Sequence, residues 1–245
     1  MERKDSSRAT RHSPHTTLKI GHRGASAHFP ENTLLAFTQA IKMGAAGVEC
    51  DVHLCASGEV VVIHDRTLKR TTGARGYVAR HTLKELKKLD AGNGEKIPTL
   101  KELLSALVPK STVFIEIKAT AAAKPAAELI TNFAKKEGVP YERMPVISFK
   151  PQHLKLVRSV NKDICIGLTP PERASALSAA FIKKAVAAGM WSVNPGIKVL
   201  SKGFVSAAHD AGLKVFTWTA NSAADIKKAY ALDVDGVMGD WPEKL

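Results

Sequence analysis

Residues 18–41, LKIGHRGASAHFPENTLLAFTQAI, contain an apolar run, a polar turn and an amphipathic helical pattern in direct succession. The run at 18–21 has the length and composition of a short strand. The apolar residues that follow recur at helical spacing, and Asn32 or Thr33 can cap this helix because both side chains accept hydrogen bonds from backbone amides. The segment is therefore one strand-and-helix unit of a parallel α/β fold.

The same unit recurs to the end of the chain, because short apolar runs alternate with amphipathic helical patterns. We expect strands at 18–21, 47–54, 112–118, 145–148, 164–168, 191–194, 214–219 and 234–238. Eight parallel strands with intervening helices predict a TIM (β/α)8 barrel.

One connection in this pattern is much longer than a link between a strand and a helix requires. Residues 55–111 separate the second and third strands, and they contain the hairpin-like GEVVVIHD and two helical patterns, TLKELKKLD and TLKELLSAL. We interpret this segment as a small insertion on the active face of the barrel. The predicted organisation is a flexible N-terminal tail at 1–17 and a single (β/α)8 domain at 18–245.

The composition argues against several classes of protein. The 245 residues are 44% hydrophobic and contain neither the apolar core of a signal peptide nor 18 successive apolar residues, so we expect a cytoplasmic protein without a membrane anchor. The net charge of +13 favours a phosphate-bearing or acidic ligand. Nucleic acid is not expected, because the lysines lie on helical patterns without interleaved aromatic residues. Three cysteines without CxxC spacing predict free thiols, and no sequence feature sets the oligomeric state.

Unusual polar side chains fall at the C-terminal ends of the predicted strands, which is where TIM barrels carry their chemistry. The candidates are His22 and Arg23 after the first strand, Glu49 and Asp51 on the second, Glu116 and Lys118 on the third, Asn194 after the sixth and Trp218 on the seventh. We expect these side chains to surround one opening.

The acidic residues among these candidates predict a metal site. Glu49 and Asp51 are two residues apart and leave the same face of their strand, as do Glu116 and Lys118. Adjacent parallel strands lie about 4.8 Å apart, so neighbouring strands would bring three carboxylates to one point. A hard divalent cation, Mg²⁺ or Ca²⁺ and also Mn²⁺, would offset their repulsion with oxygen ligands. The alternative is that these acids form salt bridges with Arg23 and Lys118.

Two of the nine histidines stand apart from the rest. His22 ends the first strand, and His64 lies in the insertion that overhangs the same opening. His53 is a further candidate ligand, although we expect it to lie beyond the strand end. Neighbouring residues of a strand face opposite ways, so we do not expect Asp65 to pair with His64.

These residue types together suit the cleavage of a phosphodiester. Two imidazoles can take a proton from a nucleophile and donate one to the leaving alkoxide. The planar fork of Arg23 can bind two phosphate oxygens, and Lys118 can add a point charge. A metal ion would neutralise the charge that develops on phosphorus-bound oxygens.

The chain resembles the glycerophosphodiester phosphodiesterase family in six blocks, from about residue 18 to the C-terminus. They are HRGASAHFPENTLLAF, GVECDVHL, VVIHDRTLKRTTG, IPTLKELL, FIEIK and VFTWTANSAADIKKAYALDVDGVMGDWP. The resemblance implies a TIM barrel with a small insertion that hydrolyses glycerophosphodiesters to sn-glycerol 3-phosphate and an alcohol. It also implies site roles: Glu49, Asp51 and Glu116 as ligands of one divalent metal ion, His22 and His64 as the acid/base pair, Arg23 and Lys118 as phosphate contacts, and Trp218 packed against the substrate.

Two departures from the family pattern and several alternatives remain. Cys55–Gly58 replaces the usual turn after the second strand, and Gly239 and Asp240 replace a Thr-Asp pair, where we expect them to shape turns rather than contact the substrate. Glu31 either orients Arg23 or favours the N-terminus of the first helix. A lysophospholipase D and a phosphate-binding barrel without catalysis are the competing functions.

Overall fold

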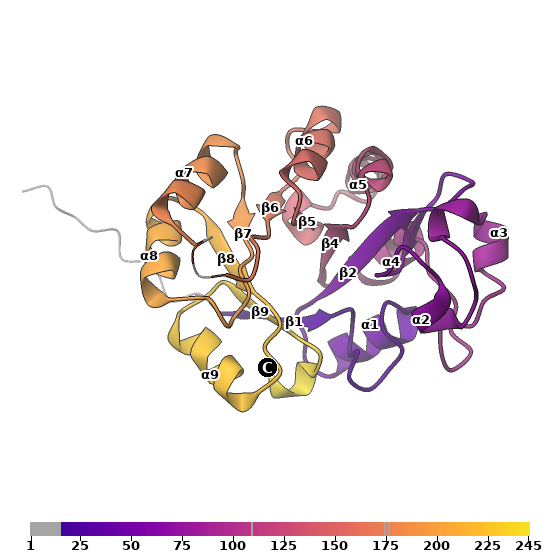
Figure 1. Cartoon of the computed structure of the whole chain (residues 1–245), viewed down its shortest axis with the longest axis horizontal. Coiled ribbons are helices and arrows are strands. Elements are labelled where there is room, and N and C mark those ends of the chain that lie inside the picture. Colours follow the sequence, from indigo (N-terminus) through magenta and orange to yellow (C-terminus); the bar gives the residue numbers. More distant parts are fainter. Residues whose placement is uncertain (1–15, 109, 174, 176) are drawn as a thin grey trace, which may run out of the picture.

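A computed structural model of the chain describes residues 16–108, 110–173, 175 and 177–245. Most of the tail predicted at 1–17 lies outside these residues. Eight parallel strands pair in a closed ring, and this confirms the predicted barrel (Figure 1). In ring order they are β1 (Leu18–His22), β2 (Gly47–Leu54), β4 (Thr112–Ile117), β5 (Val146–Ser148), β6 (Ile166–Leu168), β7 (Ser192–Val193), β8 (Lys214–Thr217) and β9 (Gly236–Gly239), which pairs back with β1.

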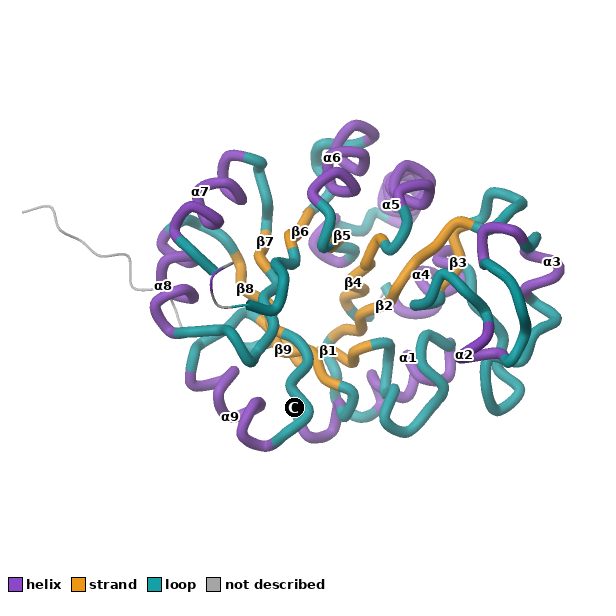
Figure 2. Tube along the Cα trace, in the orientation of Figure 1, coloured by secondary structure: helices purple, strands orange, loops and turns teal. Residues whose placement is uncertain are grey.

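Helices surround this ring of strands (Figure 2). They are α1 (Leu34–Lys42), α4 (Leu100–Leu107), α5 (Ala123–Glu137), α6 (Pro151–Val160), α7 (Ala179–Ala187), α8 (Lys202–Asp210) and α9 (Ala223–Ala231). Several begin with a hydroxyl side chain that accepts a hydrogen bond from a backbone amide of the first turn. At α1 this residue is Thr33, whereas Asn32 has a left-handed backbone with φ of 58°.

A layer of apolar side chains fills the barrel interior below the C-terminal ends of the strands. It consists of Ile20, Phe114, Ile147, Phe216 and Met238, and the rings of Phe114 and Phe216 meet edge to face at 4.8 Å between centroids. All five residues face inward from different strands, so the barrel is a packed core rather than a pore. The polar side chains above this layer therefore rest on a rigid apolar base.

The predicted insertion contains a hairpin and its own small core. β3 (Val60–Val62) pairs antiparallel with the end of β2, followed by α2 (Lys69–Thr72), a 3-10 turn at Val78–Arg80 and α3 (Leu83–Leu86). Its buried apolar residues form a cluster separate from the barrel core. The helix α4, which sequence analysis assigned to the insertion, instead packs four buried leucines into the barrel core. It is the ordinary helix between β2 and β4, because its apolar face packs into the barrel core beside β4.

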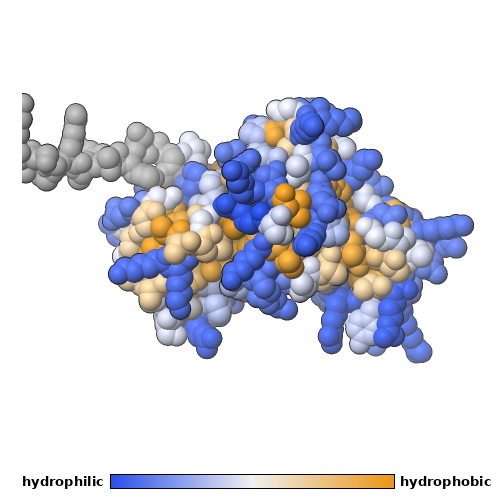
Figure 3. Space-filling model, turned by 90° about the horizontal axis from the view of Figure 1, so that it is seen from above, coloured by the Kyte–Doolittle hydropathy of each residue, from blue (hydrophilic) through white to orange (hydrophobic). Residues whose placement is uncertain are grey.

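Polar side chains cover much of the face that Figure 3 shows, with small apolar patches between them. This distribution agrees with the lysines of the sequence lying on solvated helix faces. Cys50, Cys55 and Cys165 are free and buried, as the sequence predicted. Within the described residues, none of the helices has the length and apolar character that a bilayer span requires.

A buried carboxylate ties the last two strands to α8 at the N-terminal end of the barrel. Asp235 accepts hydrogen bonds from the Val215 amide at 2.8 Å, from His209 Nε2 at 2.9 Å and from Lys214 Nζ at 3.3 Å. Burial alone would raise the pKa of Asp235, but these hydrogen bonds and the charge of Lys214 hold it below its ordinary value. Its contribution to stability is therefore present above the unfolded pKa of about 3.9 and is lost as the pH falls through the folded value.

We expect Asp235→Asn to lower the free energy of unfolding at pH 7 by about 1–3 kcal/mol, because the amide cannot accept all these hydrogen bonds. The variant should also lose less stability than the wild type on acidification. Urea unfolding at pH 7 and at pH 3 measures both effects, with the exposed Asp163→Asn as the control. Equal unfolding free energies for the wild type and Asp235→Asn at pH 7 would contradict this account.

Candidate active site

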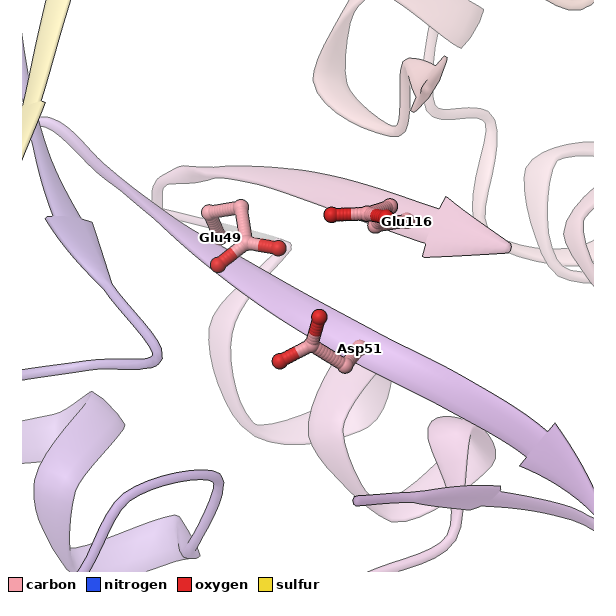
Figure 4. A group of neighbouring side chains, drawn as sticks. All are labelled: Glu49, Asp51 and Glu116. Atoms are coloured by element: carbon pink, nitrogen blue, oxygen red, sulfur yellow. The ribbon is translucent and has the colours of Figure 1, made fainter. Parts of the chain in front are cut away.

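Three carboxylates meet at the C-terminal ends of two adjacent strands. Glu49 and Asp51 extend from β2 and Glu116 from β4, and Figure 4 shows the three carboxylates facing one another. The strand register places Asp51 directly beside Glu116. One carboxylate oxygen from each residue lies within 4.8 Å of the other two. The cluster is buried, since Glu49 is only 2% and Asp51 only 1% exposed. The structure thus brings together the acidic residues singled out in the sequence.

Two cationic side chains lie beside this cluster, but they do not pair with all of its carboxylate oxygens. Lys118 Nζ lies 2.9 Å from Glu116 Oε1 and 3.5 Å from Asp51 Oδ1. Arg23 Nε lies 3.2 Å from Asp51 Oδ2 but is not aligned for a hydrogen bond. Among the described residues, neither Arg23 Nε nor Glu49 Oε1 has a hydrogen-bond partner, and both atoms are buried. The predicted salt bridges therefore exist, but unpaired carboxylate oxygen remains, which suits a divalent cation with oxygen ligands.

The protonation of the cluster reflects the same imbalance of charge. Burial and the neighbouring charge of Asp51 raise the pKa of Glu49 to about 8, and the same two causes raise the pKa of Glu116. Burial would also raise the pKa of Asp51, but Lys118 and Arg23 lower it below the ordinary value. Without a further positive charge, the three acids cannot all ionise readily near neutral pH.

Asn32 holds Asp51 in place through two hydrogen bonds. Its Nδ2 donates to Asp51 Oδ2 at 2.8 Å, and the Asp51 amide donates to its Oδ1 at 3.2 Å. The left-handed backbone of Asn32 points the amide back into the barrel, a conformation that asparagine tolerates better than most residues. The sequence predicts Asn32 only as a helix cap, and the tolerance of asparagine for a left-handed backbone is the one signal that points to its other role.

His22 is oriented by an acid from the far end of the chain. Its Nδ1 donates to Asp240 Oδ1 at 2.7 Å, which leaves Nε2 facing Glu49 Oε2 at 3.9 Å. Burial alone would lower the pKa of His22, but the hydrogen bond to Asp240 and the charge of Glu49 raise it overall. Asp240 was expected to shape a turn rather than contact the substrate, and this hydrogen bond to His22 was not anticipated. Asp240 follows β9, the neighbour of β1, so the closure of the barrel brings it to His22.

His64 is oriented by the next residue in the chain. Its Nδ1 donates to Asp65 Oδ1 at 2.7 Å, and its Nε2 lies 3.2 Å from Lys118 Nζ. The expectation that Asp65 does not pair with His64 was wrong, because β3 ends at Val62 and the alternation of a strand no longer applies. His53 belongs to β2 rather than lying beyond it, and its Nε2 donates to the His64 carbonyl at 3.0 Å.

The opposite side of the opening is aromatic and uncharged. Trp218 and Phe149 meet edge to face at 5.4 Å between centroids, and with Thr169 they line a cavity of about 330 Å³ that also includes both histidines. Asn194 supports this wall, since its carbonyl accepts a hydrogen bond from Trp218 Nε1 at 2.8 Å. Its buried amide oxygen accepts from Ser192, so the Asn194 side chain lies within the barrel.

Comparison with known proteins identifies the family. Residues 22–244 match the Glycerophosphoryl diester phosphodiesterase family. The chain belongs to this family. It is therefore a hydrolase with the TIM barrel of the glycerophosphoryl diester phosphodiesterases, a family that generally depends on a divalent metal ion.

Relatives in this family match over almost the whole chain. The glycerophosphodiester phosphodiesterase of Caldanaerobacter subterraneus is 36% identical over 94% of this chain and 96% of its own length. The crystal structure of the Thermotoga maritima glycerophosphodiester phosphodiesterase is 31% identical, with a TM-score of 0.76 over 94% of this chain and 97% of its own. An Oleispira antarctica phosphodiesterase, 27% identical with a TM-score of 0.82 over 92% and 93%, was solved with its product sn-glycerol-3-phosphate.

We expect Mg²⁺, Ca²⁺ or Mn²⁺ to raise the melting temperature of the wild type by roughly 5–10 °C at about 100-fold excess over Kd. In Glu49→Gln this rise should disappear, because a ligand is lost. The metal-free variant should melt no lower than the metal-free wild type, since one of three clustered acids has been neutralised. Calorimetric melting curves with EDTA and with each ion measure both effects.

The exposed Glu128→Gln on α5 is the matched control and should respond to metal as the wild type does. A Glu49→Gln protein that retains the full metal-dependent rise would remove Glu49 from the metal site.

Proposed function

We propose that this chain hydrolyses glycerophosphodiesters to sn-glycerol 3-phosphate and an alcohol. The observation that carries the proposal is that two of the three clustered carboxylates, both histidines and two cations line one cavity of about 330 Å³. Membership of the family and the product found in the Oleispira antarctica relative support the choice of substrate. In this proposal Glu49, Asp51 and Glu116 hold one divalent ion.

His22 and His64 act as the acid/base pair in the proposed reaction. Each imidazole donates from Nδ1 to a carboxylate, Asp240 for His22 and Asp65 for His64, so its Nε2 is free of that hydrogen bond and faces the opening. One Nε2 takes the proton from the glycerol hydroxyl next to the phosphate as that oxygen attacks phosphorus. The other donates a proton to the departing alkoxide. Water then opens the resulting cyclic phosphate, and the proton transfers run in reverse.

Arg23 and Lys118 bind the phosphate in this scheme. Glu31 accepts a hydrogen bond from Arg23 Nη1 at 3.2 Å and so directs the guanidinium towards the opening. Lys118 stands between Glu116 and His64, where its ammonium can contact a phosphate oxygen. A divalent ion at the three carboxylates would neutralise the charge that grows on the phosphate oxygens. Attack from within the substrate adds a proximity contribution to the rate.

Trp218 and Phe149 supply the apolar side of the substrate site. Phe149 is 39% exposed beside Trp218, so an apolar group could also rest there. This exposed aromatic surface is the one observation that favours the second candidate, a lysophospholipase D that accepts substrates with one acyl chain. We further propose that residues 18–245 act as one catalytic domain in the cytoplasm.

We expect glycerophosphocholine and glycerophosphoethanolamine to release sn-glycerol 3-phosphate in the presence of Mg²⁺, Ca²⁺ or Mn²⁺, and EDTA to abolish release. A coupled glycerol 3-phosphate dehydrogenase assay measures the product. Faster turnover of lysophosphatidylcholine would favour the second candidate. Binding of sn-glycerol 3-phosphate without turnover of any of these substrates would exclude both enzymatic functions and favour the phosphate-binding barrel without catalysis.

His22→Ala and His64→Ala should each lower kcat by about 10²–10⁴-fold, because each variant removes a proton-transfer group. Asp240→Asn should lower kcat less, by roughly 10-fold or more, and should shift the pH profile, since the charge that raises the pKa of His22 is lost. Steady-state kinetics between pH 5 and 9 test these values. His28→Ala is the control, because this histidine is exposed and pairs with Glu243. Wild-type turnover in either alanine variant would remove that histidine from the mechanism.

A further inference from the structure

Arg70 joins one carboxylate of the insertion to one carboxylate of the barrel. It lies on α2, and its guanidinium contacts two carboxylates at once. Nη1 and Nη2 donate to the two oxygens of Glu31, both at 2.8 Å. Nε and Nη2 donate to the two oxygens of Asp65, at 2.8 and 3.1 Å. The planar fork of arginine matches both carboxylates, which a single ammonium group cannot do.

Each of these carboxylates also holds a residue of the proposed site. Asp65 accepts the hydrogen bond from His64 Nδ1 at 2.7 Å, and Glu31 accepts from Arg23 Nη1 at 3.2 Å. A continuous chain of charge-assisted hydrogen bonds therefore runs from His64 through Asp65, Arg70 and Glu31 to Arg23. It joins a histidine of the insertion to an arginine that follows β1.

The two-pronged contacts of Arg70 with both carboxylates distinguish this network from an ordinary surface ion pair. Exposed pairs contribute little to stability, because solvent screens the charges and the side chains lose freedom. Here Glu31 and Asp65 have side chains only 19% and 27% exposed, and Arg70 is 46% exposed. The hydrogen bonds of Arg70 hold the pKa of Asp65 well below its usual range, and those of Arg70 and Arg23 lower the pKa of Glu31 despite its burial. Both acids are therefore ionised at neutral pH.

The orientation of the His64 side chain depends on this network. β3 ends at Val62, so no strand pairing fixes the backbone at His64 itself. Within the described residues, its imidazole is held by Asp65 at Nδ1 and approached by Lys118 at Nε2. Asp65 is in turn held by Arg70, whose other contact is anchored on the barrel. The orientation of the imidazole over the opening thus depends on an arginine that does not itself line the cavity.

We infer that Arg70 is a positioning residue, which fixes His64 over the barrel opening and sets its placement relative to Arg23. This inference rests on the proposed function, because it assigns Arg70 to the same reaction. Arg70 does not exchange a proton or contact the phosphate. Its contribution is the geometry of two groups that must act on one phosphodiester, and small displacements of such groups lower turnover strongly.

The test compares Arg70→Ala, Arg70→Lys and the control Arg80→Ala in the metal-loaded enzyme. Arg80 belongs to the same insertion, and its guanidinium lies over Tyr77 at 5.4 Å rather than near the opening. We expect Arg70→Ala to lower kcat by roughly 10–100-fold. Arg70→Lys should stay well below the wild type, since it keeps the charge but loses the fork. Millimolar guanidinium should restore part of the activity of Arg70→Ala, and Arg80→Ala should behave as the wild type.

Two further measurements separate positioning from a general loss of stability. The double variant Arg70→Ala/Asp65→Asn should lose less transition-state stabilisation than the two single variants lose in total. The losses are not additive because both changes break the same chain of hydrogen bonds. In ¹⁵N-histidine NMR spectra, the Nδ1-bound proton of His64 should exchange faster in Arg70→Ala than in Arg80→Ala. A merely structural arginine would produce neither the non-additivity nor the rescue.

Arg70→Ala with wild-type kcat, or Arg70→Lys with full activity, would overturn the inference. A failure of the proposed function would appear differently, as a wild type that hydrolyses no glycerophosphodiester. The two failures are therefore distinguishable, because the first appears only in the comparison of the variants.

Discussion

The arrangement of the site depends on the close approach of three buried carboxylates at the ends of β2 and β4. Parallel pairing sets Asp51 beside Glu116, and the two-residue repeat of β2 sets Glu49 on the same face. Like charges in a dry environment repel strongly, so this arrangement requires compensation. Lys118 and Arg23 supply part of it, but buried Glu49 Oε1 lacks a hydrogen-bond partner among the described residues. The strands that carry these acids enclose the packed apolar layer of the barrel.

The two histidines of the proposed acid/base pair are oriented in the same way. In each case a carboxylate accepts the Nδ1 proton, so one tautomer is selected and Nε2 is presented to the opening. The carboxylates come from unrelated places, Asp240 from the end of the barrel and Asp65 from the insertion. Ser26 and Asn221 further hold Asp240, while Arg70 holds Asp65. Orientation of the imidazoles thus requires both a closed barrel and a docked insertion.

The opening is divided into two chemically different halves. Strands β1, β2 and β4 present the charged side chains, whereas β5, β6 and β8 are followed by Phe149, Thr169 and Trp218. A phosphodiester can place its charged group against the first half and its carbon skeleton against the second. The insertion contributes His64 to the charged half, because it follows β2, one of the strands of that half.

The sequence by itself determined the barrel, the position of the insertion and the acids of the cluster. These properties follow from local periodicity, because strand and helix spacing show which side chains share a face. Contacts between distant segments were decided only by the tertiary structure: Asp240 lies 218 residues from His22, and Arg70 lies 39 from Glu31. The pairing of His64 with Asp65 also depended on where β3 ends, which periodicity does not locate. Barrel closure and the docking of the insertion bring these groups together. Local sequence patterns cannot predict such contacts, because they depend on how two separate segments pack against each other.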